Sequence, residues 1–196
     1  MKKICVFCSA SGGIDESYYK SCEELGKLMV ENDFSLVYGG SSLGLMGHIS
    51  KVIKENGGYS IGVMPEKLYN MLRHEGNCNE FHVSAGMRER KAKMDELSDG
   101  VIALAGGFGT LEEVSEMIVQ KILGYNSKPI VFLNTNGFYD TLIKFFDEII
   151  EKDFAQKSAR DVYYLAQTPE DAINYIKNYV PNYKEKTFDD IYVSAK

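Results

Sequence analysis

Several features that would place this 196-residue chain in a familiar class are missing from it. No apolar run approaches the roughly 20 residues that a helix needs to cross a bilayer. The 22 basic residues are outnumbered by 28 acidic ones, and a net charge of −6 disfavours general binding of nucleic acid. Internal repeats, low-complexity tracts and linkers are also lacking. We therefore expect a single globular domain that has neither a membrane nor a nucleic-acid partner.

Cysteine is scarce as well, with four in the chain. Cys5 and Cys8 form a C-x-x-C pattern inside a strand-like run, where alternation directs side chains to opposite faces. No second cysteine pair has the spacing of a zinc site, so we expect no metal and no redox centre. The apolar segment after Met1 is too short for a signal peptide and has no cleavage site. The sequence thus favours a cytoplasmic protein.

What the sequence does contain is a regular alternation of short apolar runs and amphipathic segments. The strand-like runs are 4–9, 34–38, 59–64, 80–83, 100–104, 129–133 and 162–166. Three helical segments have both ends marked, namely 15–32, 87–98 and 138–152. Another lies between the glycine turn at 39–47 and the glycines at 57–58, one follows the glycine turn after Leu104 and ends at 123, and the last starts at 168. Segment 66–79 predicts only a loop with a helical turn.

This alternation is typical of an α/β fold with a mostly parallel sheet and helices on both faces. We expect the domain to span 1–180. Residues 181–196 form a polar and aromatic tail that either packs on a partner subunit or is mobile. Three strand ends, after Phe7, Tyr38 and Leu104, run into glycine turns. Because ligands bind outside the carboxyl ends of parallel strands, all three turns are expected to face one pocket.

The turn after Leu104 holds the strongest local signal. Gly106, Gly107 and Gly109 let the backbone approach a ligand closely, and the N–H groups of the following helix attract an anion such as phosphate. Glu113 lies one turn into that helix, which is an odd place for a residue that only binds phosphate. Thr110 and Glu113 also fit a capping box, with Thr110 as the N-cap, so a purely structural interpretation stays open.

An arginine in the preceding helical segment is unusually placed. At helical spacing Arg90 shares a stripe with Met87, Met94 and Leu97, which is expected to face the body of the protein. A guanidinium on such a stripe needs an anionic partner, because an unpaired buried charge is costly. The alternative is a long side chain that reaches solvent or bonds to a helix end.

Together these segments resemble a known family. Met87-x-x-Arg90-Lys91, followed by Gly106-Gly107-x-Gly109-Thr110-x-x-Glu113, is similar to the signature of the LOG ("lonely guy") proteins. These are cytokinin riboside 5'-monophosphate phosphoribohydrolases, often mislabelled lysine decarboxylases. The resemblance covers roughly residues 4–133, and its further segments are Cys5–Ser9, Tyr38–Gly40, Gly44–Gly47 and Leu123–Pro129.

The resemblance implies a Rossmann-like fold, a homodimer and no cofactor. It implies hydrolysis of the N-glycosidic bond of an N6-substituted adenosine monophosphate, which releases the free base and ribose 5-phosphate. Arg90 and Glu113 match the catalytic arginine and glutamate. The positions that correspond to nucleotide binding are Met87, Lys91, Gly106, Gly107, Gly109, Thr110, Gly39 and Gly40.

The sequence departs from the family at four places. Ala105 stands where proline is usual, and Ser41 replaces a third glycine after Gly39-Gly40. Residues 120–122 differ from the usual tryptophan-alanine-glutamine. An upstream glutamate that helps to hold the ligand has no clear counterpart around Glu66 and Lys67. The last two departures leave the preferred base open.

Two other functions compete with this interpretation. One is a nucleosidase that prefers AMP or another nucleotide. The other is a nucleotide or cofactor carrier without turnover, which could use the same glycine turns but has no need of Arg90 and Glu113 together. A decarboxylase would need pyridoxal phosphate and a Schiff-base lysine, and nothing in the sequence singles one out.

Overall fold

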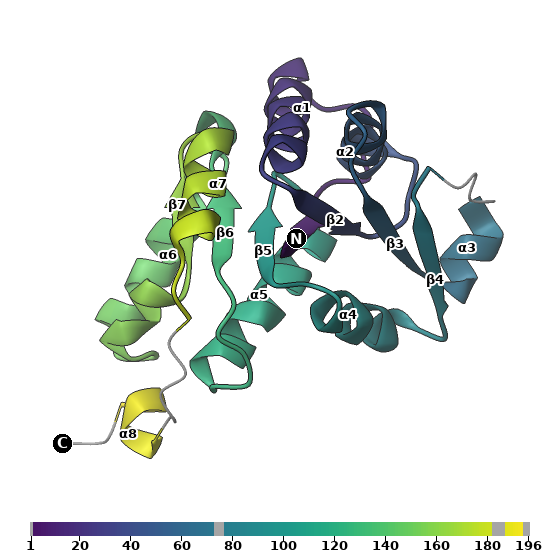
Figure 1. The fold of residues 1–196 in the computed structure, drawn as a ribbon. Helices are drawn as coiled ribbons and strands as arrows, with labels where there is room; N and C mark the ends of the chain where they lie inside the picture. Colours follow the sequence, from purple (N-terminus) through teal and green to yellow (C-terminus); the bar gives the residue numbers. More distant parts are fainter. Residues whose placement is uncertain (1, 73–76, 182–186, 194–196) are drawn as a thin grey trace.

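The structure is a computed structural model that describes residues 2–72, 77–181 and 187–193. Its centre is one seven-stranded sheet with the order β4-β3-β2-β1-β5-β6-β7, in which every neighbouring pair is parallel (Figure 1). The strands are β1 (Lys2–Phe7), β2 (Phe34–Tyr38), β3 (Ser60–Pro65), β4 (Glu80–Ser84), β5 (Gly100–Ala103), β6 (Ile130–Leu133) and β7 (Tyr164–Ala166). The predicted parallel α/β fold is confirmed.

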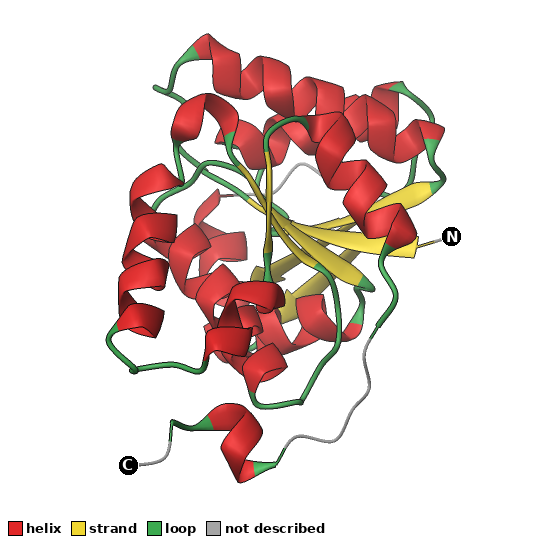
Figure 2. Cartoon of the chain, turned by 90° about the vertical axis from the view of Figure 1, so that its left-hand side faces the viewer, coloured by secondary structure: helices red, strands yellow, loops and turns green. Residues whose placement is uncertain are grey.

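Helices connect the strands and cover both faces of the sheet (Figure 2). In the described residues these are α1 (Glu16–Glu31), α2 (Gly44–Glu55), α3 (Glu66–Leu72), α4 (Met87–Glu96), α5 (Phe108–Ile122), α6 (Asp140–Glu151), α7 (Pro169–Asn178) and α8 (Phe188–Ile191), with 3-10 turns η1 (Thr135–Gly137) and η2 (Lys157–Val162). None of these helices combines the length and the apolar character that a bilayer span requires.

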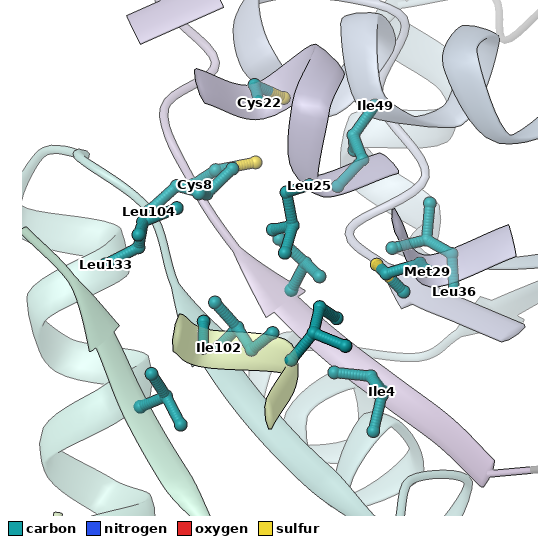
Figure 3. Close-up of a cluster of buried hydrophobic side chains, with 14 of the residues drawn as sticks. Ile4, Cys8, Cys22, Leu25, Met29, Leu36, Ile49, Ile102, Leu104 and Leu133 are labelled. Carbon is teal, nitrogen blue, oxygen red and sulfur yellow. The ribbon is translucent and has the colours of Figure 1, made fainter. Parts of the chain in front are cut away.

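Alternation along β1 divides the core into two layers. Ile4 and Val6 pack in a cluster with residues of α1, α2 and α7 (Figure 3). Cys5 and Phe7 point the other way, into a cluster with residues of α4, α5 and α6. Cys8 lies in the first cluster, so the two cysteines of the C-x-x-C pattern face opposite sides of the sheet, as predicted.

Two helices start with side-chain caps at the positions where the sequence predicts helical segments to begin. Asp15 accepts a hydrogen bond from the backbone N–H of Ser17 at 2.9 Å and caps α1. Thr168 caps α7 through the N–H of Asp171 at 3.1 Å, and Pro169 occupies the first helical position. The helical ranges predicted from the sequence begin at these same two residues, 15 and 168.

Other boundaries differ from the prediction. Helix α6 starts at Asp140, two residues after the predicted start, and packs on the core through Leu142, Ile143 and Phe146, whereas Phe145 is 55% exposed. The run 162–166 is a strand only from Tyr164, because η2 extends to Val162. Segment 66–72 is a helix, whereas 73–76 lie outside the described residues.

The described part of the C-terminal tail contains α8 and is bonded to its own chain. Gln156 donates a hydrogen bond from Nε2 to the backbone oxygen of Asp189 at 2.9 Å. Residues 182–186 and 194–196 of the tail lie outside the described residues.

The strand order reverses at β1, which has β2 on one side and β5 on the other. Such a reversal opens a crevice at the carboxyl ends of the strands. The three predicted turns meet there. The N–H of Ser9 donates to the oxygen of Ala105 at 3.2 Å, and the N–H of Leu45 donates to the oxygen of Ser9 at 2.9 Å. The fold thus brings the three glycine turns together at the carboxyl ends of the strands.

Candidate active site

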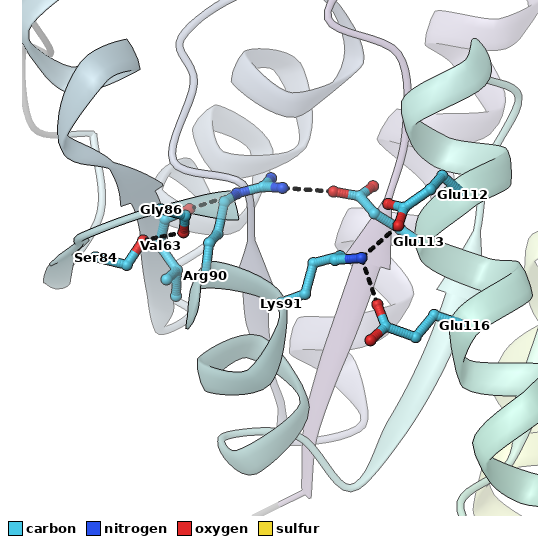
Figure 4. A network of polar contacts seen from close by, with 8 residues as sticks. All are labelled: Val63, Ser84, Gly86, Arg90, Lys91, Glu112, Glu113 and Glu116. Atoms are coloured by element: carbon cyan, nitrogen blue, oxygen red, sulfur yellow. Dashed lines mark hydrogen bonds and ion pairs between the residues drawn. The ribbon is translucent and has the colours of Figure 1, made fainter. Parts of the chain in front are cut away.

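Two helices bring the candidate catalytic residues together at the carboxyl ends of the strands. Helix α4 follows β4 and carries Arg90 in its first turns, and helix α5 follows β5 and carries Glu113 (Figure 4). The Nη1 atom of Arg90 donates to Oε1 of Glu113 at 2.5 Å. Both side chains are only 6% exposed. The buried arginine therefore has the anionic partner that its position in the sequence requires. The alternative, a side chain that reaches solvent or bonds to a helix end, is wrong.

A second hydrogen bond sets the direction of the guanidinium. The Nε atom of Arg90 donates to the backbone oxygen of Val63 in β3 at 3.0 Å. With one donor held by the sheet and another by Glu113, the planar group has little freedom to rotate. Sequence reasoning missed Val63, because a backbone carbonyl carries no signature of its own.

The glycines after β2 make room for this pair. A β-carbon built on Gly39 would overlap Nη2 of Arg90 and stand 2.9 Å from Sδ of Met46. Gly40 has a φ of +74°, and a β-carbon there would lie 2.9 Å from the Phe81 ring. Gly40 is therefore needed for its backbone conformation. Gly39 is needed for the close approach of the guanidinium.

Burial and charge act in opposite directions on Glu113. Burial raises the pKa of its carboxyl group, and the charge and hydrogen bond of Arg90 lower it, so that the pKa remains above the ordinary value of glutamate. A carboxyl group with a raised pKa beside a fixed cation is suited to exchange of a proton or to stabilisation of positive charge.

The start of α5 differs from the capping-box prediction. The N-cap is Gly107, and no described side chain caps the helix. Thr110 lies inside the helix, and the carboxylate of Glu113 bonds to Arg90. The capping-box interpretation is therefore wrong, because a partner on another helix holds Glu113. The N–H groups at the start of α5 keep the anion-binding character of an uncapped helix terminus.

Within the turn itself, the three glycines have different surroundings. A β-carbon on Gly106 would overlap the side chain of Thr110, which is buried. Gly107 and Gly109 have no described atom within 4 Å of such a carbon. Phe108 between them is 92% exposed. Gly106 therefore shapes the turn, whereas Gly107 and Gly109 border open space.

The remaining candidates from the sequence are placed as follows. Met87 begins α4 and is half exposed, although the stripe predicted it to face the body of the protein. The ammonium group of Lys91 pairs with Glu112 and, at 2.6 Å, with Oε2 of Glu116. Sequence reasoning missed both glutamates, although their four-residue spacing puts them on one face of a helix.

In the described residues no group of three or more His, Cys, Asp or Glu side chains could hold a metal ion. All four cysteines lie among those residues and are free thiols. Burial raises the pKa of the Cys5 and Cys8 thiols. Neutral buried thiols of this kind are poor nucleophiles.

Comparison with known proteins gives consistent matches over most of the chain. The family model described as possible lysine decarboxylase matches residues 46–176. A probable cytokinin riboside 5'-monophosphate phosphoribohydrolase of Oryza sativa subsp. japonica is 41% identical over 182 residues, which cover 93% of this chain and 73% of that protein. A cytokinin riboside 5'-monophosphate phosphoribohydrolase of Arabidopsis thaliana is 39% identical over 184 residues, 94% of this chain and 86% of that protein.

Solved structures with the same fold include two proteins named for the molybdenum cofactor. The carrier protein from Chlamydomonas reinhardtii has a TM-score of 0.66 at 26% identity, over 90% of this chain and 96% of that one. The binding protein from Rippkaea orientalis has a TM-score of 0.69 at 24% identity, over 90% of this chain and 96% of that one. At 24% identity, the likeness to the Rippkaea orientalis protein shows a shared fold alone.

Proposed function

This chain belongs to the family of cytokinin riboside 5'-monophosphate phosphoribohydrolases, and from that membership we propose that it hydrolyses the N-glycosidic bond of N6-substituted adenosine 5'-monophosphates. The products are the free base and ribose 5-phosphate. Water supplies the oxygen that bonds to the anomeric carbon. The electron pair of the broken bond leaves with the base, which gains a proton.

The buried contact between Arg90 and Glu113 is the observation that supports this chemistry most strongly. Cleavage of a ribosyl–base bond builds positive charge on the sugar, in a transition state like an oxocarbenium ion. The carboxylate of Glu113 either stabilises that cation or activates water as a general base. Arg90 orients the carboxylate and steadies negative charge on the departing base.

We assign the 5'-phosphate to the start of α5. The uncapped N–H groups and the open space beside Gly107 and Gly109 suit an anion, and Gly106 holds the turn in shape against Thr110. A phosphate gripped there fixes the ribose relative to Glu113. Binding energy from this remote group then contributes to the rate of the chemical step.

The decarboxylase description of the family model has less support in the site. A lysine that forms a Schiff base acts as a neutral amine. Burial lowers the pKa of Lys91, the lysine next to Arg90, but hydrogen bonds with Glu112 and Glu116 outweigh burial and raise it. Lys91 therefore stays protonated.

A carrier without turnover is the second candidate, and the likeness to the molybdenum cofactor carrier favours it. A carrier needs the fold and the anion-binding turn. It has no use for a buried carboxylate with a raised pKa against an arginine, so we place hydrolysis first.

One assay separates the candidates. The purified protein is incubated with N6-isopentenyl-AMP, with AMP and with N6-isopentenyladenosine, and ribose 5-phosphate and free base are measured. We expect hydrolysis with the highest kcat/KM on N6-isopentenyl-AMP. A higher kcat/KM on AMP would identify the general nucleosidase. Recovery of every nucleotide unaltered would favour the carrier.

We also propose a cytoplasmic homodimer with a hydrolase domain over residues 1–180. The dimer rests on the family resemblance, and the free cysteines are typical of a reducing compartment. Sedimentation analysis of the purified protein tests the dimer.

A further inference from the structure

Neighbouring residues of α4 bind neighbouring residues of α5. Arg90 bonds to Glu113, and the next residue, Lys91, bonds to Glu112 and Glu116 (Figure 4). Helix α4 leads into β5 and α5 leaves it, so the chain connects the two helices only through that strand. The ion pairs add a direct side-chain link between the two helices.

The Lys91 contact differs from the common surface ion pair. Its side chain is 15% exposed and bridges two helices. Lys93, on the same helix, pairs with Glu96 three residues along. The helix already fixes both ends of that second pair, and exposed pairs of this kind contribute little to stability. Glu112 and Glu116 are 57% and 40% exposed, so solvent reaches the Lys91 pairs from the carboxylate side. What distinguishes them from the Lys93 pair is that they connect two helices.

The charge around Lys91 also argues against a role in phosphate binding. One ammonium group faces two carboxylates, so the three side chains together carry a net negative charge. A phosphate that approached them would meet repulsion from Glu112 and Glu116. The start of α5 offers N–H groups with no such competition among the described side chains.

Lys91 is well placed to control the rotation of α4. It is adjacent to Arg90, and turning α4 about its axis would move both side chains relative to α5. Catalytic geometry is sensitive to such movement, because a misplacement of about 1 Å can reduce a rate by about 100-fold.

We propose that Lys91 is a positioning residue, which ties α4 to α5 through Glu112 and Glu116 and so fixes Arg90 against Glu113. This inference rests on the proposed hydrolytic function, and it changes the role that the family resemblance implies for Lys91. The electrostatics agree with it. The charge of Lys91 lowers the pKa of Glu113, whereas that of Glu112 raises it.

The test compares Lys91→Gln, Lys91→Arg and the matched control Lys93→Gln. Each is assayed for kcat and KM on N6-isopentenyl-AMP, and the dissociation constant for AMP is measured by calorimetry. For Lys91→Gln we expect kcat to fall about tenfold or more while KM stays within about twofold, the signature of a lost transition-state interaction. We also expect the acid limb of the kcat–pH profile of Lys91→Gln to move to higher pH. Lys91→Arg should recover most of kcat, and Lys93→Gln should match the unmodified protein.

Two results would overturn the proposal. If Lys91→Gln raises KM and the dissociation constant for AMP about tenfold or more with kcat retained, Lys91 binds the nucleotide directly. If it lowers Tm but leaves kcat per folded molecule and the pH profile unchanged, its role is structural only.

Failure of the proposed function gives a different pattern. In that case the unmodified protein turns over none of the nucleotides, and the binding measurement alone decides the role of Lys91. If the dissociation constant for AMP is unchanged in Lys91→Gln, the result supports the proposal that Lys91 does not contact the phosphate. An increase of about tenfold contradicts the proposal.

Discussion

The main chain of Gly39 lies against the guanidinium group of Arg90, so closely that a single methyl group on Gly39 would overlap Nη2. The φ of Gly39 is not in the left-handed region, so its backbone suits other residues. Glycine is needed there for space. The turn after β2 and the helix after β4 therefore define the position of Arg90 together.

We predict that Gly39→Ala displaces the guanidinium from Glu113 and lowers kcat by about 10-fold to 100-fold in a protein that still folds. Gly26→Ala in α1 is the control, because its new methyl would press on Val52 in α2, 2.7 Å away, and none of its nearest neighbours belongs to Arg90. Both variants are assayed per folded molecule, with folding followed by circular dichroism. Equal kcat values in the two variants would show that Gly39 has no specific link to Arg90.

For Glu113→Gln we predict that hydrolysis falls by about 100-fold to 10,000-fold, the range associated with a lost general base. Glutamine keeps an oxygen that can accept from Nη1 of Arg90 but has no charge and cannot take a proton. Nucleotide binding by calorimetry should therefore change little. Glu96→Gln on the exposed end of α4 is the matched control. Normal turnover in Glu113→Gln would remove this residue from the chemistry.

The pH dependence should show the raised pKa of Glu113. Burial favours the neutral acid, so the proton stays bound to a higher pH than in an exposed glutamate, even though Arg90 lowers the pKa in part. If the carboxylate is the active form, kcat/KM falls as the pH drops through this raised pKa. The measurement is kcat/KM on N6-isopentenyl-AMP across the acid range. An acid limb at the pKa of an ordinary glutamate would contradict the prediction.

Much of the fold follows from local patterns in the sequence. Short apolar runs between amphipathic segments indicated the parallel sheet, and the helical ranges that begin at 15 and 168 agree with the observed caps Asp15 and Thr168. Arg90 was recognised because a charged residue on an apolar stripe needs a partner. Each of these signals acts over a few residues, so that the sequence alone can display it.

The details of the site depend on contacts between distant segments. Thr110 and Glu113 have the spacing of a capping box, but Arg90, 23 positions away, holds the carboxylate of Glu113. For Glu113 the sequence allows two partners, and the packing of α4 beside α5 selects Arg90. Glu112 and Glu116 hold the ammonium group of Lys91, and its role at the nucleotide stays a prediction.

The open space at the turn before α5 gives a final prediction. A methyl group on Gly107 or Gly109 would meet no described atom within 4 Å, and neither residue has a positive φ. We therefore expect Gly107→Ala and Gly109→Ala to leave Tm unchanged or slightly raised, because alanine reduces the entropy of the unfolded chain. If the phosphate occupies this space, the methyl group meets the ligand, and the dissociation constant for AMP should rise about tenfold or more.

The comparison with adenosine, which has no phosphate, isolates the cause. The two variants should bind adenosine as the unmodified protein does, because the added methyl group faces only the phosphate position. Calorimetry with AMP and adenosine on each variant provides the measurement, and a thermal melt provides the stability. Equal weakening for both ligands would place the methyl group against the sugar or base, and unchanged AMP binding would move the phosphate away from α5.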